Sequence, residues 1–204
     1  MRTRLALRVA SLVFVTATFA NAQSAEPPTY AVGDNWTTTL GEVRVVKVDG
    51  NGVAIVRPQS PFCPTCTFVY DKELTLLQVL ETDGKPADTS KFGFLGLGPE
   101  WKFYQFPLEV KKKWRIEAHG QFRGSNVPYV VDSTVSALED VKTKAGTFKA
   151  YRIDRDWKIR VSTNVPPTWK TTDWFAPEVK WNVKFESSAR NAREWELVSY
   201  GPKR

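Results

Sequence analysis

The sequence predicts an all-β fold: an antiparallel, strongly curved sheet, a half-barrel or a two-layer sandwich of about ten strands, with little helix. Two observations favour this class. Apolar and polar residues alternate along several segments, and 8 Trp, 12 Phe and 6 Tyr are many for 204 residues. Alternation places one face of a strand on a core and the other in water, as in antiparallel sheets. Aromatic side chains fit the half-buried surface of such a sheet.

Strand patterns follow one another from residue 36 onward. A β-branched run at 36–48 ends in the hairpin signal Asp49-Gly50-Asn51-Gly52, and 53–56 is the expected return strand. Alternating or β-branched segments then predict further strands at 114–123, 129–138, 151–161, 179–186 and 194–200. A series of this kind favours an antiparallel architecture over a parallel α/β one.

Helix signals are weak in this sequence. The best candidate is 71–81, where Asp71 could cap a helix, but the residue three positions later is Leu74, so no capping box forms. The alternation within this segment fits a strand at least as well. Segment 88–107 carries spaced glycines, and we expect a long, partly apolar loop there, of a kind that tends to be functional or mobile.

The N-terminus predicts export. Three arginines precede a largely apolar run at 9–20, which ends in the small-x-small cleavage pattern Ala20-Asn21-Ala22. These features make a Sec-type signal peptide over residues 1–22, cleaved after Ala22. The apolar run is shorter than the roughly 20 residues of a membrane-spanning helix, and the alternative is a short buried helix. We expect a periplasmic or secreted protein that is not a lipoprotein, because no cysteine stands at the cleavage site.

The mature chain is expected to form one β domain over residues 31–204, after a flexible leader at 23–30. Removal of the signal peptide takes away three arginines and no acid, so the net charge falls from +7 to +4. Basic and acidic residues are interleaved, without the basic stripe that nucleic-acid binding requires. We therefore expect no nucleic acid as a partner, and no later segment is apolar enough to span a membrane.

Cys63 and Cys66 are the two cysteines of the chain and form a Cys-x-x-Cys arrangement. A thioredoxin-type site needs this motif at the start of a helix, but the residues after Cys66 are strand-like. A structural zinc site needs four ligands, and the chain has a single histidine, so carboxylates would be required. Pro64 favours a tight turn, and exported compartments oxidise thiols. We predict a structural disulfide, with a redox-active pair or a metal site as the alternatives.

The sequence shows no catalytic set. His119, the single histidine, lies on the polar face of its strand and is expected to be exposed. The nucleophile-elbow, P-loop, HExxH and EF-hand patterns are missing. Carboxylate pairs that hydrolyse sugars are set by the fold and not by sequence spacing, so this chemistry stays open. No metal or cofactor is predicted.

Arg155 and several tryptophans are the candidate ligand-binding residues. On a regular strand, Arg155 occupies an inward position, where a charge must be paired or face a cavity. It could lie in a bulge, pair with a nearby acid, or bind the carboxylate or phosphate of a ligand. Four tryptophans cluster in the C-terminal third, where they could pack the core or hold a sugar or acyl chain: Trp157, Trp169, Trp174 and Trp181. Trp157, Trp174 and Trp181 join Arg155 as candidates.

Several segments resemble an uncharacterised family of exported bacterial β-rich envelope proteins, a domain of unknown function. The matching pieces are V-G-x-x-W at 32–36, FPL-x-V at 106–110, AGTF-x-AY at 145–151 and W-F-A-P-E-V at 174–179. The resemblance implies a curved antiparallel sheet or half-barrel in the cell envelope, supports a turn at Gly146-Thr147, and supplies no catalytic residues. Such proteins often carry glycine or proline where this chain has lysine, which suggests altered turns at Lys111, Lys144 and Lys180.

Together these observations predict an exported, non-catalytic envelope protein whose concave β face binds a hydrophobic or sugar-like ligand. One alternative is an enzyme, either a thiol-disulfide exchanger that uses Cys63 and Cys66 or a carboxylate-based hydrolase of wall sugars. A second alternative is a scaffold that binds another envelope protein through an edge strand.

Overall fold

The computed structural model describes residues 24–50, 52–57, 63–89, 96–122, 124–161, 167–190 and 192–202. The predicted signal peptide at 1–22, with its cleavage after Ala22, lies outside these ranges. Within the described ranges, no helix has the length and apolar character that crossing a membrane requires.

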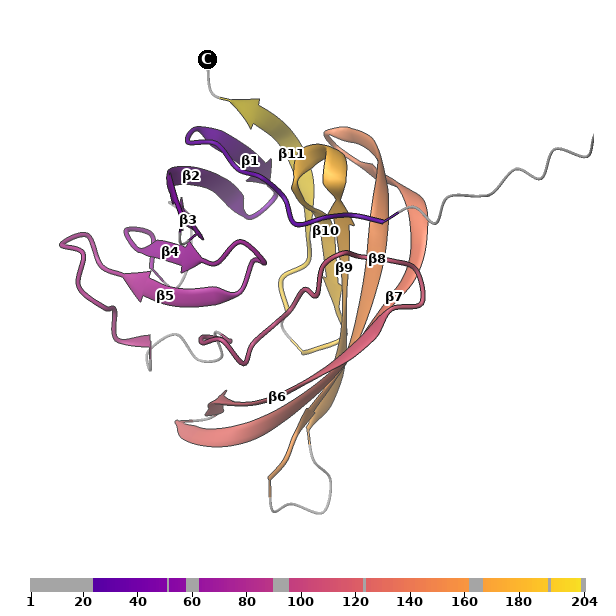
Figure 1. The fold of residues 1–204 in the computed structure, drawn as a ribbon. Coiled ribbons are helices and arrows are strands. Elements are labelled where there is room, and N and C mark those ends of the chain that lie inside the picture. Colours follow the sequence, from indigo (N-terminus) through magenta and orange to yellow (C-terminus); the bar gives the residue numbers. More distant parts are fainter. Residues whose placement is uncertain are drawn as a thin grey trace, which may run out of the picture.

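Eleven strands in the described ranges form one antiparallel sheet (Figure 1): β1 (Asp34–Thr38), β2 (Gly41–Asp49), β3 (Gly52–Val56), β4 (Thr67–Tyr70), β5 (Leu76–Leu80), β6 (Lys113–Phe122), β7 (Ser125–Thr143), β8 (Gly146–Ile159), β9 (Thr168–Ala176), β10 (Trp181–Ser187) and β11 (Trp195–Pro202). Their order is β5-β4-β3-β2-β1-β11-β10-β9-β8-β7-β6, and a 3-10 turn, η2 (Pro177–Val179), precedes β10. The all-β prediction is confirmed. Of the predicted architectures, the structure has the curved, open half-barrel.

Strand β11 joins the two halves of the sheet. Its first residues pair with β10, with Glu196 opposite Lys184, whereas its last residues pair with β1, with Tyr200 opposite Trp36. Because one strand serves two neighbours in turn, the sheet can curl until β1 to β5 lie across from β7 to β10 (Figure 1). The curl gathers the apolar side chains of both halves into one buried core.

Alternation along the strands decides which side chains reach that core. In β8 the buried residues Ile153, Arg155 and Trp157 alternate with Asp156 and the other more exposed positions. The inward position predicted for Arg155 is therefore confirmed. The long strand β7 carries a bulge between its Val135 and Ala137 pairings with β8, and such a bulge bends a strand and increases its twist.

The connection between β5 and β6 closes the open side of the core. The described part of the predicted loop at 88–107 contains no strand, and residues 90–95 lie outside the described ranges. Trp101 and Tyr104 of this connection are buried, and the Trp101 indole N–H donates to the backbone oxygen of His119 at 3.3 Å. The loop is therefore a part of the core, with its rings packed against the concave face of the sheet.

The leader that the sequence predicts as flexible, 23–30, is held in its described part. Ala25 is buried, and it exchanges backbone hydrogen bonds of 2.9 and 2.7 Å with Leu108. The Tyr30 hydroxyl donates to the backbone oxygen of Lys180 at 2.8 Å. The polar composition favours flexibility, but these long-range contacts tie the leader to the loop and to the turn before β10.

Turns interrupt the sequence patterns at two places. The run at 36–48 is two strands, β1 and β2, and the Thr38 hydroxyl accepts a hydrogen bond of 3.2 Å from a backbone N–H in the turn between them. Of the two alternatives for 71–81, the strand is confirmed, because a turn is followed by β5 and no helix forms there. There the Asp71 carboxylate accepts two backbone N–H groups, at 2.9 and 2.8 Å, which favours a turn over a helix.

The lysines at glycine-type positions keep a glycine-type backbone. Lys111 and Lys180 have φ angles of 78° and 60°, in the left-handed region that disfavours residues with a Cβ. The two lysines therefore carry the conformational cost that a glycine would avoid. The third lysine, Lys144, lies in a turn that it forms with Ala145. The turn expected at Gly146-Thr147 therefore lies two residues earlier, and Gly146 is the first residue of β8.

We expect Lys111→Gly to stabilise the protein. The left-handed conformation costs a residue with a side chain about 1–2 kcal/mol, and part of this is offset by the larger entropy of glycine in the unfolded chain. The free energy of unfolding should rise by about 0.5–1 kcal/mol, measured by urea denaturation. As a control, Lys113→Gly at the exposed start of β6 should lower it by a similar amount. Equal destabilisation by both substitutions would contradict this account.

We expect the free energy of unfolding to fall at alkaline pH because of the buried phenol of Tyr129. Its ring packs against Trp101, with 5.5 Å between ring centroids, and burial raises the pKa of its phenol to about 12. The unfolded phenol has a pKa near 10, so the unfolded state loses its proton first as the pH rises. This contribution to stability is complete below pH 10 and is lost between pH 10 and about 12. Urea midpoints across this range should fall less in Tyr129→Phe than in the wild type.

Candidate functional site

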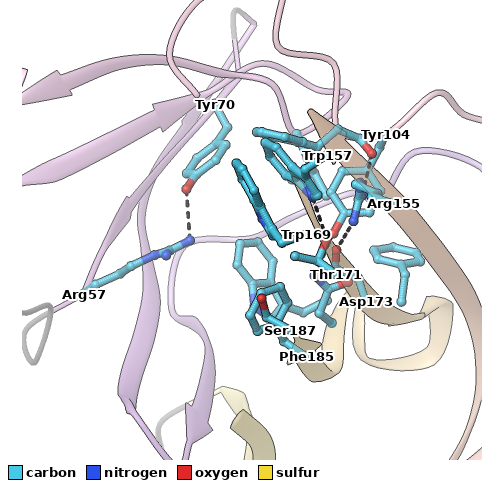
Figure 2. Close-up of a pocket in the computed structure, with 15 residues that line it drawn as sticks. Arg57, Tyr70, Tyr104, Arg155, Trp157, Trp169, Thr171, Asp173, Phe185 and Ser187 are labelled. Atoms are coloured by element: carbon cyan, nitrogen blue, oxygen red, sulfur yellow. Dashed lines mark hydrogen bonds and ion pairs between the residues drawn. The ribbon is translucent and has the colours of Figure 1, made fainter. Parts of the chain in front are cut away.

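A cavity of about 360 Å³ lies inside the curve of the sheet. One side is formed by residues at the ends of β3 and β4 and in the turn that follows, the middle by the connection before β6, and the other side by β8, β9 and β10 (Figure 2). Fifteen residues line it: Arg57, Tyr70, Leu74, Phe103, Tyr104, Arg155, Trp157, Trp169, Thr171, Asp173, Phe175, Trp181, Asn182, Phe185 and Ser187.

Strand periodicity explains most of this lining. Along β9, every second residue from Trp169 to Phe175 faces the cavity, because successive side chains point to opposite faces of a sheet. In β10 the pairing with β9 shifts between Asn182 and Lys184. This irregularity changes the alternation, so that Asn182 and Phe185, which are three positions apart, both line the cavity.

Stacked indoles form one wall of the cavity. The rings of Trp157 and Trp169 lie 5.2 Å apart at an interplanar angle of 13°, and Phe103 packs 5.8 Å from Trp157. The Trp157 indole N–H donates to the Thr171 hydroxyl at 2.9 Å, so the polar atom of this buried ring is satisfied within the protein. The wall is flat and apolar, and the half-buried Trp169 leaves part of its ring accessible.

A buried ion pair between β8 and β9 also bonds the sheet to the connection before β6. Arg155, only 2% exposed, donates from Nη1 to the Asp173 carboxylate and from Nη2 to the backbone oxygen of Phe103, the latter at 2.7 Å. The Asn182 amide donates to Asp173 at 3.0 Å and to the Tyr104 hydroxyl at 2.7 Å. Burial lowers the pKa of Arg155 and raises the pKa of Tyr104. Of the roles open to Arg155, the structure shows pairing with a nearby acid at a position that lines the cavity.

A second arginine, which the sequence did not single out, lines the opposite side. Arg57 follows the last residue of β3, and its Nη2 donates to the Tyr70 hydroxyl at 3.0 Å. Its guanidinium lies over the rings of Phe68 and Trp181, 5.3 and 6.0 Å from their centroids. The sequence gives no signal for this role, because Arg57 reaches Trp181 only through the curl of the sheet.

The structure brings together three of the four predicted ligand residues. Arg155, Trp157 and Trp181 line the cavity, whereas Trp174 does not. Trp174 alternates with Asp173 and Phe175, so it points to the opposite face of β9. There its indole N–H donates to Glu139 at 2.7 Å, and the Lys184 ammonium lies 4.9 Å from its ring centroid.

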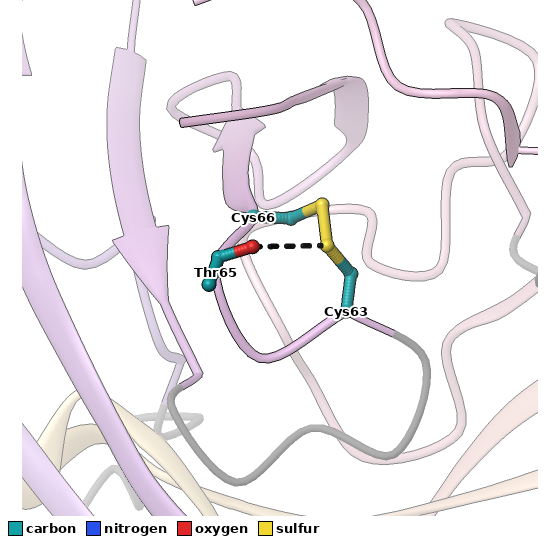
Figure 3. Close-up of a disulfide and its surroundings, with 3 residues drawn as sticks. All are labelled: Cys63, Thr65 and Cys66. Atoms are coloured by element: carbon teal, nitrogen blue, oxygen red, sulfur yellow. Dashed lines mark hydrogen bonds between the residues drawn. A yellow bond between two sulfur atoms is a disulfide. The ribbon is translucent and has the colours of Figure 1, made fainter. Parts of the chain in front are cut away.

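The predicted disulfide between Cys63 and Cys66 is present (Figure 3), and neither cysteine lines the cavity. The disulfide closes a tight turn just before β4, in which the Cys66 N–H donates to the Cys63 backbone oxygen at 3.4 Å. The residues directly after Cys66 form strand β4 and not the start of a helix, and Cys66 packs in the core. His119 is exposed on β6, and the described ranges contain no cluster of three potential metal ligands.

We expect Asp173→Asn to destabilise the protein strongly, because it leaves the Arg155 charge buried without its counter-ion. Removal of one partner of a buried pair costs about 3–5 kcal/mol, measured here as the free energy of unfolding in urea. The double variant Arg155→Met/Asp173→Leu, which buries no charge, should lose less than the single variant. A double variant that is as unstable as Asp173→Asn would show that the charge is not the cause.

Comparisons with known proteins give a partial match. Residues 110–200, which span β6 to most of β11, match the model of the DUF3108-like family. Two solved structures resemble the chain. The first is the hypothetical lipoprotein YmcC from Escherichia coli (K12), with a TM-score of 0.42 and 10% sequence identity over 83% of this chain and 84% of that chain. The second is described as a lipoprotein from Parabacteroides distasonis, with a TM-score of 0.44 and 12% sequence identity over 88% of this chain and 100% of that chain. No curated protein matches. The chain is thus similar, over residues 110–200, to the DUF3108-like family.

Proposed function

We propose that this protein is exported to the cell envelope and there holds an apolar or sugar-like ligand, without catalysis, in the cavity of its curved sheet. The observation that carries the proposal is the cavity itself, about 360 Å³ in volume and lined mainly by aromatic rings. Ligand sites are typically concave and apolar, with a few polar groups that orient the ligand, and have volumes of about 300–1,000 Å³. The location rests on the predicted signal peptide at 1–22.

The aromatic wall supports binding of a ligand with a flat or extended apolar surface. Trp157 and Trp169 present stacked rings, and sugars and acyl chains both pack on such rings. The Trp157 indole N–H is already bonded to Thr171. The wall therefore offers mostly carbon surface to a ligand.

The small number of carboxylates in the described lining of the cavity favours ligand binding over sugar hydrolysis. Hydrolysis of glycosides usually uses two carboxyl groups that flank the substrate. Among the described residues that line the cavity, Asp173 is the only carboxylate, and both of its oxygens are engaged, one by Arg155 and one by Asn182. An acid held in this way is poorly placed to donate or accept a proton.

Thiol-disulfide exchange and edge-strand scaffolding have less support than ligand binding. The disulfide lies in a turn before β4 rather than at a helix N-terminus, where a first thiol would be activated. Of the two edge strands, β6 carries the charged residues Lys113, Arg115 and Glu117, and charges on an edge discourage pairing with another strand. Backbone oxygens of the other edge strand, β5, accept hydrogen bonds from the N–H groups of Ala87 and Gly98. Both observations therefore favour a role centred on the cavity.

The test is a titration of the mature chain with 1-dodecanol and with maltohexaose, followed by tryptophan fluorescence, together with native mass spectrometry of protein purified from its own periplasm. We expect saturable binding of one class with one ligand per chain. Trp169→Leu should weaken it at least about tenfold, because the wall loses a ring worth roughly 1.4 kcal/mol or more.

Trp174→Leu is the matched control, because this tryptophan lies on the other face of the same strand. It should leave the affinity unchanged, with folding checked by circular dichroism. No binding of either probe and no co-purified ligand would refute the proposed function, and so would equal weakening by both substitutions in folded protein.

A further inference from the structure

The two arginines of the cavity differ in how their charge is compensated. Arg155 has a carboxylate partner, Asp173, and its second terminal nitrogen is bonded to the backbone oxygen of Phe103. Within the protein this charge is neutralised. Arg155 is therefore a structural group, and a ligand would have to break the ion pair to use it.

Arg57 has no such compensation. Its described contacts are with neutral groups: the Tyr70 hydroxyl and the faces of Phe68 and Trp181. No carboxylate among the described residues forms an ion pair with it, and its Nε is buried without a hydrogen-bond partner. A partly buried charge among aromatic rings is costly unless an anion pairs with it.

The place of Arg57 next to the aromatic wall defines what kind of anion fits. Its guanidinium lies over the Trp181 ring, which itself lines the cavity together with Phe185 and Trp169. Figure 2 shows the Arg57 side chain reaching from the end of its strand toward Tyr70 and Trp169. A ligand whose head pairs with Arg57 would have its remaining atoms against carbon surface.

We infer that the cavity binds an anionic amphiphile, with a carboxylate or phosphate head on Arg57 and an apolar tail along the tryptophan wall. This rests on the proposed function and names its ligand class. The guanidinium fork matches carboxylate and phosphate oxygens in a bidentate manner, and such charge-assisted bonds are stronger than neutral ones. An uncharged sugar would leave the charge uncompensated, and a cationic amphiphile would be repelled by it.

The test compares ligands that share one tail and differ in the head. Dodecanoate, dodecyl phosphate, 1-dodecanol and dodecyltrimethylammonium are titrated below their micelle concentrations into the mature chain, and inorganic phosphate is titrated alone. At least one of the two anions should bind about 10- to 100-fold more tightly than the alcohol, the range expected for a charged hydrogen bond. The tighter of the two anions identifies the head group as carboxylate or phosphate.

Arg57→Gln should remove this preference by weakening the tighter anion about 10- to 100-fold while leaving the alcohol unchanged. Arg160→Gln is the matched control: Arg160 is exposed, pairs with Glu117 at 3.3 Å and does not line the cavity. It should change neither affinity. If Arg57→Gln does not fold, the series of head groups on the wild-type chain decides alone.

The outcomes separate the inference from the proposed function. Alcohol binding as tight as both anions, or an anion preference that survives Arg57→Gln, overturns the inference and leaves the apolar cavity intact. If inorganic phosphate binds as tightly as dodecyl phosphate, the site holds an adventitious ion only, and this result also overturns the inference. If none of the amphiphiles and no sugar binds, the proposed function itself fails.

Discussion

A sheet without a layer of helices has to cover its own apolar face, and the rest of this structure depends on that constraint. The chain meets it in two ways. Strand β11 pairs first with β10 and then with β1, which lets the sheet curl over itself, and the connection after β5 packs Trp101 and Tyr104 onto the concave face. Each large aromatic ring buries about 150–250 Å² of surface, so a few rings can replace a helix as the cover.

The same solution explains why a cavity exists and why polar groups surround it. A curved sheet and an irregular loop do not match as closely as two regular layers, and the remaining space is lined by whatever side chains point inward. Arg155 is one of them, and its pairing with Asp173 and with the backbone of Phe103 turns a costly buried charge into a bond between the sheet and its cover. The ion pair thus preserves the shape of the cavity without being available to a ligand.

The two halves of the sheet contribute differently to the site. Residues 110–200, the part similar to the DUF3108-like family, supply the tryptophan wall and the ion pair. Arg57 and Tyr70 come from the preceding half and add a charge that no carboxylate among the described residues neutralises. In this chain the apolar wall and the uncompensated charge are therefore separate features, carried by different parts of the sequence and joined by the curl of the sheet.

The sequence by itself determined many of the strands and their inward faces, because alternation with period two is a local property, but it predicted no strand over β9 (Thr168–Ala176). It placed Arg155 and Trp157 inside and His119 outside, and it identified the disulfide turn at Cys63 and Cys66. Local patterns could not show which tryptophans of different strands share the concave face, so the candidate ligand residues include Trp174, which lies on the other face of β9. Only the tertiary structure decided that Asp173 neutralises Arg155, that the leader and the loop cover the core, and that Arg57 meets Trp181. These contacts join residues far apart in the chain, and their geometry is set by the curl of the whole sheet, which no local pattern of residues encodes.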